Sequence, residues 1–204
     1  MSSEHSELWS NHKIKDNMKV IYTLLTLAFL LLSPTEATLE KEPKTELNTP
    51  DGGKITLLTV HTQNRQTDLV LSKTNSDGNE EWVKYYGGKG WEYGSDLITT
   101  KDGGYLILGE TSSYGKGNND VYLLKVTDSG KKQWQNTFGR SYNDYGKMIC
   151  TTKNGYLINA TQQDCSRDSD DPTPEDCDIL YWDIYVDFEG NKIEDFKRLK
   201  AKDY

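Results

Sequence analysis

The sequence predicts an all-β protein built from antiparallel four-stranded repeat units, and three observations support this fold class. Trp82 and Trp134 lie 52 positions apart, and so do Gly78 and Gly130, which is the self-similarity of a repeat array. Between these residues run short segments rich in Val, Ile, Leu, Tyr and Thr, bounded by clusters of Gly, Asn and Asp, as in strands joined by tight turns. The region lacks the 3.6-residue apolar period that would indicate helices.

The second copy of the repeat is the clearest, and its strands can be placed in order. Asp-Gly and Gly-Gly pairs such as Asp102-Gly103-Gly104 favour the positive φ angles of tight hairpins, so they mark the ends of strands. The predicted strands of this copy are Gly104–Thr111, Asp120–Thr127, Lys132–Phe138 and Tyr145–Thr152.

The repeat domain is predicted to span residues 51–204, in units of about 51–101, 102–153 and 154–204. Four antiparallel strands in about fifty residues is the size of one blade of a β-propeller. The third unit is degraded and is expected to lack its fourth strand. Closed propellers have about four to eight blades, so we expect a partial propeller. The chain is then a truncated fragment or half of a ring that a homodimer completes, and both are favoured over an open array, which would leave sheet edges exposed.

One segment carries a resemblance to a known family. Thr127–Trp134, preceded by Val121–Lys125, resembles the tryptophan-docking repeat of quinoprotein-type propellers, and the fifty-residue unit resembles the repeats of secreted propeller proteins. The resemblance implies that Trp82 and Trp134 are packing residues, docked through turns that contain Gly78 and Gly130. Quinoprotein dehydrogenases also carry a vicinal disulfide, and this chain has no adjacent cysteine pair.

The N-terminal fifty residues indicate export. Residues 1–17 form a polar extension, and residues 18–37 combine a Lys, an apolar run and a small residue, as in a signal peptide. The apolar run is shorter than the roughly twenty residues of a membrane span, so no stable span is expected. The alternative is a signal anchor that tethers the protein through residues 20–32. Residues 38–50 are predicted to be a linker, and the protein to be secreted, extracellular or periplasmic.

Three cysteines and one sequon fit an exported chain. Cys165 and Cys177 bracket an acidic insertion and are predicted to form a disulfide, whereas Cys150 is expected to be a buried, inert thiol. Asn159 begins an Asn-Ala-Thr sequon and is a candidate glycosylation site.

The acidic insertion is the candidate metal site. Calcium takes six to eight oxygen ligands, and a disulfide-closed loop could supply several of them. Its spacing does not match an EF-hand, so a solvated, variable insertion is the other interpretation, and no cofactor is predicted. The candidate ligands are Asp168, Asp170, Asp171, Glu175 and Asp176.

Two further acidic residues recur with the repeat. Glu92 and Asp144 lie 52 positions apart, each before Tyr-Gly, and are expected to bond the backbone of their own loops. A repeated, inward-pointing ligand site is the alternative. His61 is the only histidine after the signal segment, and it lies in a predicted strand, so no catalytic histidine constellation is evident.

Charge and motifs together favour a binding or scaffold function. A net charge of −8 is unfavourable for a nucleic-acid partner. We therefore expect a non-enzymatic, exported binding or scaffold module whose partner is a glycan, a protein or a second copy of itself. The alternatives are a propeller enzyme, either quinoprotein-like or a glycoside hydrolase, and a truncated fragment without independent activity.

Overall fold

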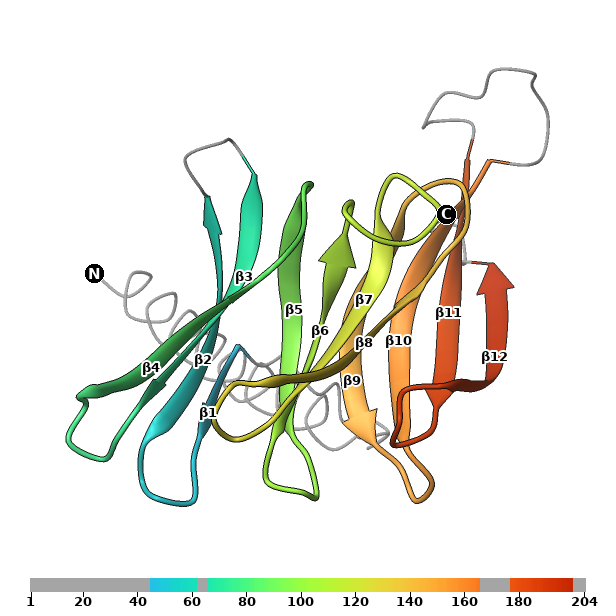
Figure 1. Cartoon of the computed structure of the whole chain (residues 1–204). Helices are drawn as coiled ribbons and strands as arrows, with labels where there is room; N and C mark the ends of the chain where they lie inside the picture. The colour runs from blue at the N-terminus through green and yellow to red at the C-terminus, as the bar shows by residue number, and fades with distance from the viewer. Residues whose placement is uncertain (1–44, 62–65, 166–176, 200–204) are drawn as a thin grey trace, which may run out of the picture. The chain divides into compact units, whose positions relative to one another are not determined.

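Three antiparallel four-stranded sheets make up the protein (Figure 1). The structure is a computed structural model that describes residues 45–61, 66–165 and 177–199, which belong to one compact unit, Lys41–Tyr204. Every regular element among these residues is a strand, which confirms the all-β class and the four-stranded units.

The sheets follow one another along the chain, and within each sheet every strand pairs with the next. Sheet 1 contains β1 (Glu46–Asn48), β2 (Lys54–His61), β3 (Thr67–Thr74) and β4 (Glu80–Tyr86). Sheet 2 contains β5 (Glu92–Thr99), β6 (Tyr105–Thr111), β7 (Asp120–Val126) and β8 (Lys132–Phe138). Sheet 3 contains β9 (Asp144–Thr151), β10 (Tyr156–Asp164), β11 (Asp178–Val186) and β12 (Lys192–Leu199).

The sheets begin one strand earlier than the repeat units drawn from the sequence. Strand β5 falls in the unit 51–101 but pairs with β6 of sheet 2, and β9 falls in the unit 102–153 but pairs with β10 of sheet 3. A tandem repeat has no marked beginning in its sequence. The break falls at links 87–91 and 139–143, where the chain passes from one sheet to the next. Among the described residues the unit 154–204 holds three strands, as expected, but sheet 3 is a complete four-stranded sheet because β9 of the preceding unit joins it.

Part of the predicted linker is also a strand. Residues 46–48 form β1, whose register pairs Leu47 with Ile55 of β2. Leu47 packs against a buried cluster of the core, so pairing and burial order a segment whose own composition does not favour a strand. The linker prediction is therefore wrong for the end of the stretch 38–50.

Repeated five-residue turns close one end of the sheets, which we call the turn end. In three of them the N–H of the fifth residue donates to a side-chain oxygen of the first, Asn75, Thr127 or Asp187, at 2.7–3.0 Å. The glycine of each turn has a positive φ, for example +81° at Gly78. Such side-chain-to-backbone bonds are those of Asx and related turns.

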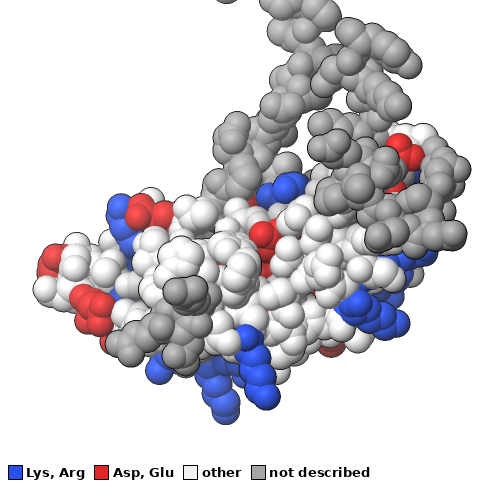
Figure 2. Space-filling model, turned by 90° about the horizontal axis from the view of Figure 1, so that it is seen from above, with Lys and Arg blue, Asp and Glu red and all other residues white. Residues whose placement is uncertain are grey.

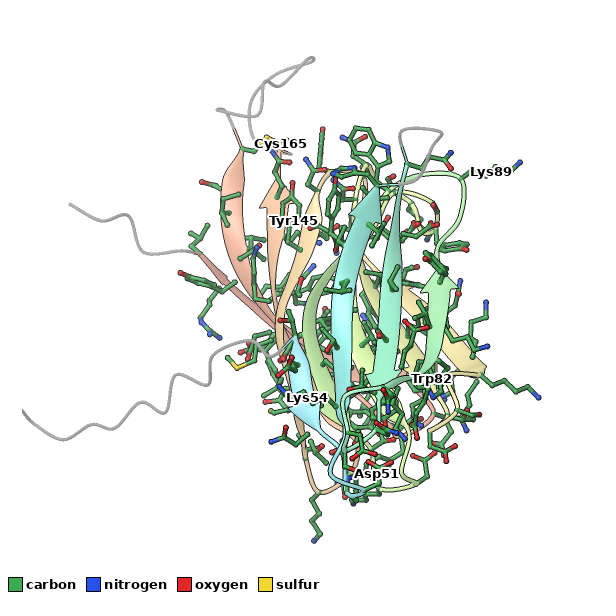
Figure 3. The ribbon with its side chains drawn as sticks, turned by 90° about the vertical axis from the view of Figure 1, so that its left-hand side faces the viewer. Asp51, Lys54, Trp82, Lys89, Tyr145 and Cys165 are labelled. Atoms are coloured by element: carbon green, nitrogen blue, oxygen red, sulfur yellow. A yellow bond between two sulfur atoms is a disulfide. The ribbon has the colours of Figure 1, made fainter. Side chains whose placement is uncertain are left out.

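The opposite end, which we call the loop end, carries the links 87–91 and 139–143 and the loop 112–119. Figure 3 shows both ends in one view: Asp51 and Trp82 lie toward the turn end, and Lys89 and Cys165 lie toward the loop end.

Two apolar clusters hold the sheets together, and sheet 2 contributes to both. Alternate residues of a strand point to opposite faces, so Tyr105 and Ile107 pack toward sheet 1 while Leu106 and Leu108 pack toward sheet 3. All four are buried. A fully buried aliphatic side chain contributes about 1.5–3 kcal/mol, so stacking on both faces is the main stabilising term for this sheet. We call the contact of sheets 1 and 2 the first joint, and that of sheets 2 and 3 the second joint.

At the turn end, a tryptophan of one sheet packs on a glycine turn of the next. A Cβ added at Gly130 of sheet 2 would lie 3.1 Å from the indole of Trp82, and one added at Gly190 of sheet 3 would lie 2.6 Å from that of Trp134. The carbonyls of the same glycines accept hydrogen bonds from the preceding sheet, from Tyr86 Oη at 2.6 Å and from Asn136 Nδ2 at 2.8 Å. Gly78, the equivalent glycine of sheet 1, has nothing within 4 Å of such a Cβ.

Candidate ligand pocket at the second joint

Buried carboxylates fix the links at the loop end. The Glu92 side chain accepts bonds from the Gly88 N–H at 3.0 Å and the Thr111 hydroxyl at 2.6 Å. The Asp144 side chain likewise accepts the Arg140 N–H at 2.8 Å and the Gln162 side-chain amide at 2.7 Å. The sequence prediction that these residues bond the backbone of their own loops is confirmed, and the bonds hold each link against the sheet that follows it.

A second carboxylate approaches each link at a glycine. A Cβ added at Gly139 would overlap Asp120 Oδ1 and lie 2.6 Å from Asp144 Oδ2, so only glycine fits between these two acids. Burial, together with the charge of Asp120, raises the pKa of Asp144 above its ordinary value. Gly87 has the same relation to Asp68 and Glu92 at the first joint.

A cavity of about 470 Å³ lies beside this carboxylate pair at the second joint. Its walls come from the loop 112–119, the end of β8, the link after it, and strands β11 and β12. The lining residues are Gly115, Lys116, Asp120, Thr137, Phe138, Gly139, Arg140, Trp182, Lys192, Asp195 and Lys197. We call this cavity the second-joint pocket.

Backbone hydrogen bonds place two of its cations. Asp120 Oδ2 accepts the N–H groups of Lys116 at 3.0 Å and Gly117 at 2.9 Å, which fixes the loop that carries Lys116. Arg140 is held by the bond from its own N–H to Asp144. Both positions are therefore set by buried acids rather than by the long basic side chains.

Strands β11 and β12 supply the other wall through a connected set of bonds. Lys197 Nζ donates to Gln162 Oε1 at 2.6 Å and lies 4.3 Å from the centroid of the Trp182 ring. The Trp182 indole N–H donates to Asp195 Oδ2 at 2.6 Å, and Lys192 Nζ reaches Asp195 Oδ1 at 3.4 Å. Because Gln162 also bonds Asp144, this wall is tied to the link across the pocket.

The pocket is positive within an acidic protein. Four cationic side chains line it against two carboxylates, those of Asp120 and Asp195. Within the described part of the chain, neither Lys116 nor Arg140 forms an ion pair. From above, one group of Lys and Arg side chains lies on the right, on the side where Figure 1 places β11 and β12 (Figure 2).

The pKa shifts agree with this excess of positive charge. Burial lowers the pKa of Lys197, and the nearby Arg140 charge lowers it further. Burial would raise the pKa of Asp195, but the Trp182 bond and the charges of Lys192 and Lys197 outweigh it, so this pKa is lowered. An anion entering the pocket would relieve the repulsion between Lys197 and Arg140.

The first joint has the same framework but a different lining. Tyr122 takes the place of Trp182, and its hydroxyl donates to Gln135 at 2.9 Å as the indole does to Asp195. Tyr114 stacks on the Tyr122 ring at 5.7 Å between centroids, and its hydroxyl donates to the Gly87 carbonyl at 2.7 Å. An aromatic side chain thus covers the ring at the first joint, whereas a lysine ammonium lies over it at the second.

Several residues singled out in the sequence lie away from this pocket. Cys165 and Cys177 form the predicted disulfide. Asn159 lies within β10, and its Nδ2 donates to Asp183 at 2.7 Å; its glycosylation stays a prediction. Cys150 is a free, half-buried thiol rather than a buried one, because its position in β9 is opposite Leu157, whose side chain lies outside both core clusters.

The predicted calcium ligands fall outside the described residues, namely Asp168, Asp170, Asp171, Glu175 and Asp176. Among the residues that the structure does describe, no group of three or more His, Cys, Asp or Glu side chains gathers as a metal site would require. The same part of the chain contains no helix long and apolar enough to cross a membrane, and residues 18–37 lie outside it.

The basic residues of the pocket were not singled out in the sequence. Lys116 and Arg140 follow glycines in irregular segments, and neither recurs in the other copies of the repeat. The only signal was the departure from the repeat itself: positions 88 and 140 are 52 apart, but the first is Gly and the second is Arg.

Comparisons with known proteins give no family for this chain. No model of a known protein family matches the sequence, and no curated protein matches it significantly.

Proposed function

We propose that this protein is an exported, non-enzymatic binding module whose ligand, a glycan, occupies the second-joint pocket. One observation carries the proposal: two joints share one framework, yet the second is an open, polar cavity of about 470 Å³ while an aromatic ring covers the first. Ligand pockets have volumes of about 300–1,000 Å³, so one or two sugar rings fit this cavity.

The shape of the site favours a glycan over a protein partner. A stable protein interface buries about 800 Å² on each partner, usually around apolar anchors. The second-joint pocket is small, concave and lined mainly by charged and polar side chains. Hydroxyl-rich sugars match such a lining, while Phe138 adds apolar surface for a ring face.

Two wider features support the same proposal. Three stacked, four-stranded sheets joined by tryptophan–glycine contacts agree with part of a β-propeller, a fold that presents loops at one end of its blades. The Cys165–Cys177 disulfide is of the kind that persists in oxidising compartments, which supports export.

The test is amide chemical-shift mapping of the isotopically labelled protein with a panel of neutral and acidic oligosaccharides. We expect saturable shifts at residues 115–117, 137–140 and 192–197. The links and strands of the first joint serve as an internal control, because they share the framework. Shifts confined to another surface, or none with any member of the panel, would contradict the proposal; the same mapping with candidate protein partners then examines the other ligand class.

A further inference from the structure

We infer that the ligand of the second-joint pocket is an acidic sugar, whose carboxylate or sulfate group is bound by Arg140 and Lys116. The inference rests on the proposed function, because it specifies the ligand of that same pocket. It commits to an anionic group on a glycan and assigns recognition to two residues that form no ion pair with any residue the structure describes.

The first argument is the balance of charge inside the pocket. Both lining carboxylates are already engaged: Asp120 accepts two backbone N–H groups, and Asp195 accepts the Trp182 indole and faces Lys192. Lys192 is therefore partly neutralised by Asp195. The four cations outnumber the two carboxylates by two, and within the described residues Lys116, Arg140 and Lys197 are the ones that form no ion pair.

The second argument is that the side chain of Lys197 and the backbone that carries Lys116 and Arg140 are fixed before a ligand binds. Lys197 is fixed by Gln162 and the Trp182 ring, and the backbone of Lys116 and Arg140 is fixed by Asp120 and Asp144. Loop ordering therefore costs little when a ligand binds. A guanidinium presents a fork that matches a carboxylate or sulfate, and a lysine ammonium that lines the same pocket adds a second charged donor.

The third argument is the contrast with the first joint. There Gly88 stands in place of Arg140, Thr137 in place of Lys197, and Gln135 in place of Asp195. The first joint thus has a buried acid, Glu92, that holds the link 87–91, but it lacks basic residues at the positions of Arg140 and Lys197. Arg140 and Lys197 have no basic equivalent at the first joint, so the shared framework does not require cations at these two positions.

Calorimetric titration of the protein tests this with matched probes. The first pair is trigalacturonic acid and its fully methyl-esterified form, which share a backbone and differ in charge. The second pair is a sulfated galactan tetrasaccharide and its desulfated form. We expect at least one acidic probe to bind about tenfold or more tightly than its neutral partner, because charge-assisted hydrogen bonds are lost with the charge. The pair that responds identifies carboxylate or sulfate as the group recognised.

Variants identify the residues. We expect Arg140→Gln and Lys116→Gln each to weaken the binding of the acidic probe about tenfold. Each variant should also reduce the salt dependence of that affinity. Lys131→Gln, an exposed lysine at the turn end, is the control and should leave both unchanged. A second control is the thermal melt of each variant, which separates loss of binding from loss of fold.

The outcomes separate the inference from the function on which it rests. Equal binding of charged and neutral probes, mapped to the pocket amides, overturns the acidic-sugar inference and leaves the glycan-binding function standing. Preference for acidic probes that Arg140→Gln and Lys116→Gln do not change overturns the assignment of recognition to these residues. Binding of none of the four probes overturns the inference; whether the function also fails is then decided by the wider neutral panel.

Discussion

Lys125 is a buried lysine whose ammonium is surrounded by acceptors. Its side chain is 4% exposed, and Nζ donates to both oxygens of Asp102 at 3.0 Å, to Gln133 Oε1 at 2.7 Å and to the Val126 carbonyl at 3.2 Å. Lys73 forms the equivalent set of bonds in sheet 1, with Asp51 at 2.8 Å and Glu81 at 2.6 Å. We call each such set of bonds around a lysine ammonium a lysine clamp. Each lysine clamp ties a turn to the two strands beyond it, and removing one partner would leave an unpaired charge.

This lysine clamp predicts a loss of stability in acid. The bond from the Thr100 hydroxyl and the Lys125 ammonium outweigh desolvation and lower the pKa of Asp102 to about 2, below its ordinary 3.8. A lowered acid pKa stabilises the fold above the unfolded pKa, so this contribution is complete above about pH 4 and disappears as the pH falls toward 2. We expect Asp102→Asn to be less stable than the wild type at pH 6, and the difference to shrink at pH 2.

Urea unfolding of both proteins at a series of pH values measures that difference. Glu194→Gln is a suitable control, because this exposed acid lies in β12, away from Lys125 and Asp102, and its variant should track the wild type. A stability difference between wild type and Asp102→Asn that stays constant from pH 6 to pH 2 would show that the charge of Asp102 does not support the fold.

The residues of the site that could be predicted from the sequence are those that recur with the 52-residue repeat. Glu92 and Asp144 stood out because they recur 52 positions apart, and their bonds to the links follow from that fixed place. Lys116 and Arg140 carry no such signal. Their importance depends on which sheets stack and where the cavity falls, and neither can be derived from spacing in the sequence.

At the scale of elements, the contact between a tryptophan and a glycine turn sets how neighbouring sheets dock. Gly190 and Gly78 form a matched pair: both have positive φ, +85° and +81°, but only Gly190 lies against an indole, that of Trp134. Alanine at either position bears the strain of the left-handed backbone, about 1 kcal/mol. Alanine at Gly190 also meets the ring, and overpacking costs about 1–3 kcal/mol more.

We therefore expect Gly190→Ala to lower the free energy of unfolding by about 1–3 kcal/mol more than Gly78→Ala. Denaturant unfolding followed by tryptophan fluorescence measures both. Trp134→Phe in the Gly190→Ala background should recover part of the loss, since it shortens the ring that clashes. Equal costs for the two glycine variants would mean that the indole does not press on the turn.

Strand positions were predictable to within about one residue, because turns at Asp-Gly and Gly-Gly pairs bound them. The predicted segment Lys132–Phe138 is β8, and Tyr145–Thr152 is β9 displaced by one. The grouping of strands into sheets was not predictable, because a hairpin turn and a link between sheets look alike as short glycine-rich segments. Only the packing of one sheet on the next separates the two.

At the scale of the whole molecule, the outward faces of the terminal sheets differ from the faces of sheet 2. On sheet 2 the cross-strand pairs Tyr105–Val126 and Ile107–Leu124 are apolar and buried. The equivalent pairs on the outer face of sheet 1 are Lys54–Thr74 and Thr56–Ser72. On sheet 3, Asn159–Asp183 takes the place of Leu108–Leu123. Repeat arrays remain soluble when their terminal units carry polar outer faces.

The polar and charged pairs favour an open array of three sheets over the dimeric ring that the sequence also allows, whereas exposed apolar side chains on the same sheets, such as Leu58, Tyr85 and Phe196, favour the ring. We take the cost of burying the charges to be the larger of the two. A ring would bury Lys54 of one copy and the Asp183–Arg198 pair of another, at the cost of desolvating charges. We expect light scattering coupled to size exclusion to give the mass of a single chain at micromolar concentration. A concentration-independent mass of two chains would contradict this and support ring closure.

The central claim is that a glycan bearing an acidic group binds between sheets 2 and 3. A crystal structure of the protein grown with the acidic probe that binds in solution tests it most directly. We predict ligand density inside the second-joint pocket, with the anionic group within hydrogen-bond distance of Arg140 and Lys116 and no ligand at the first joint. Density for the ligand on another surface, or in the pocket with its anionic group turned away from both cations, would contradict the account.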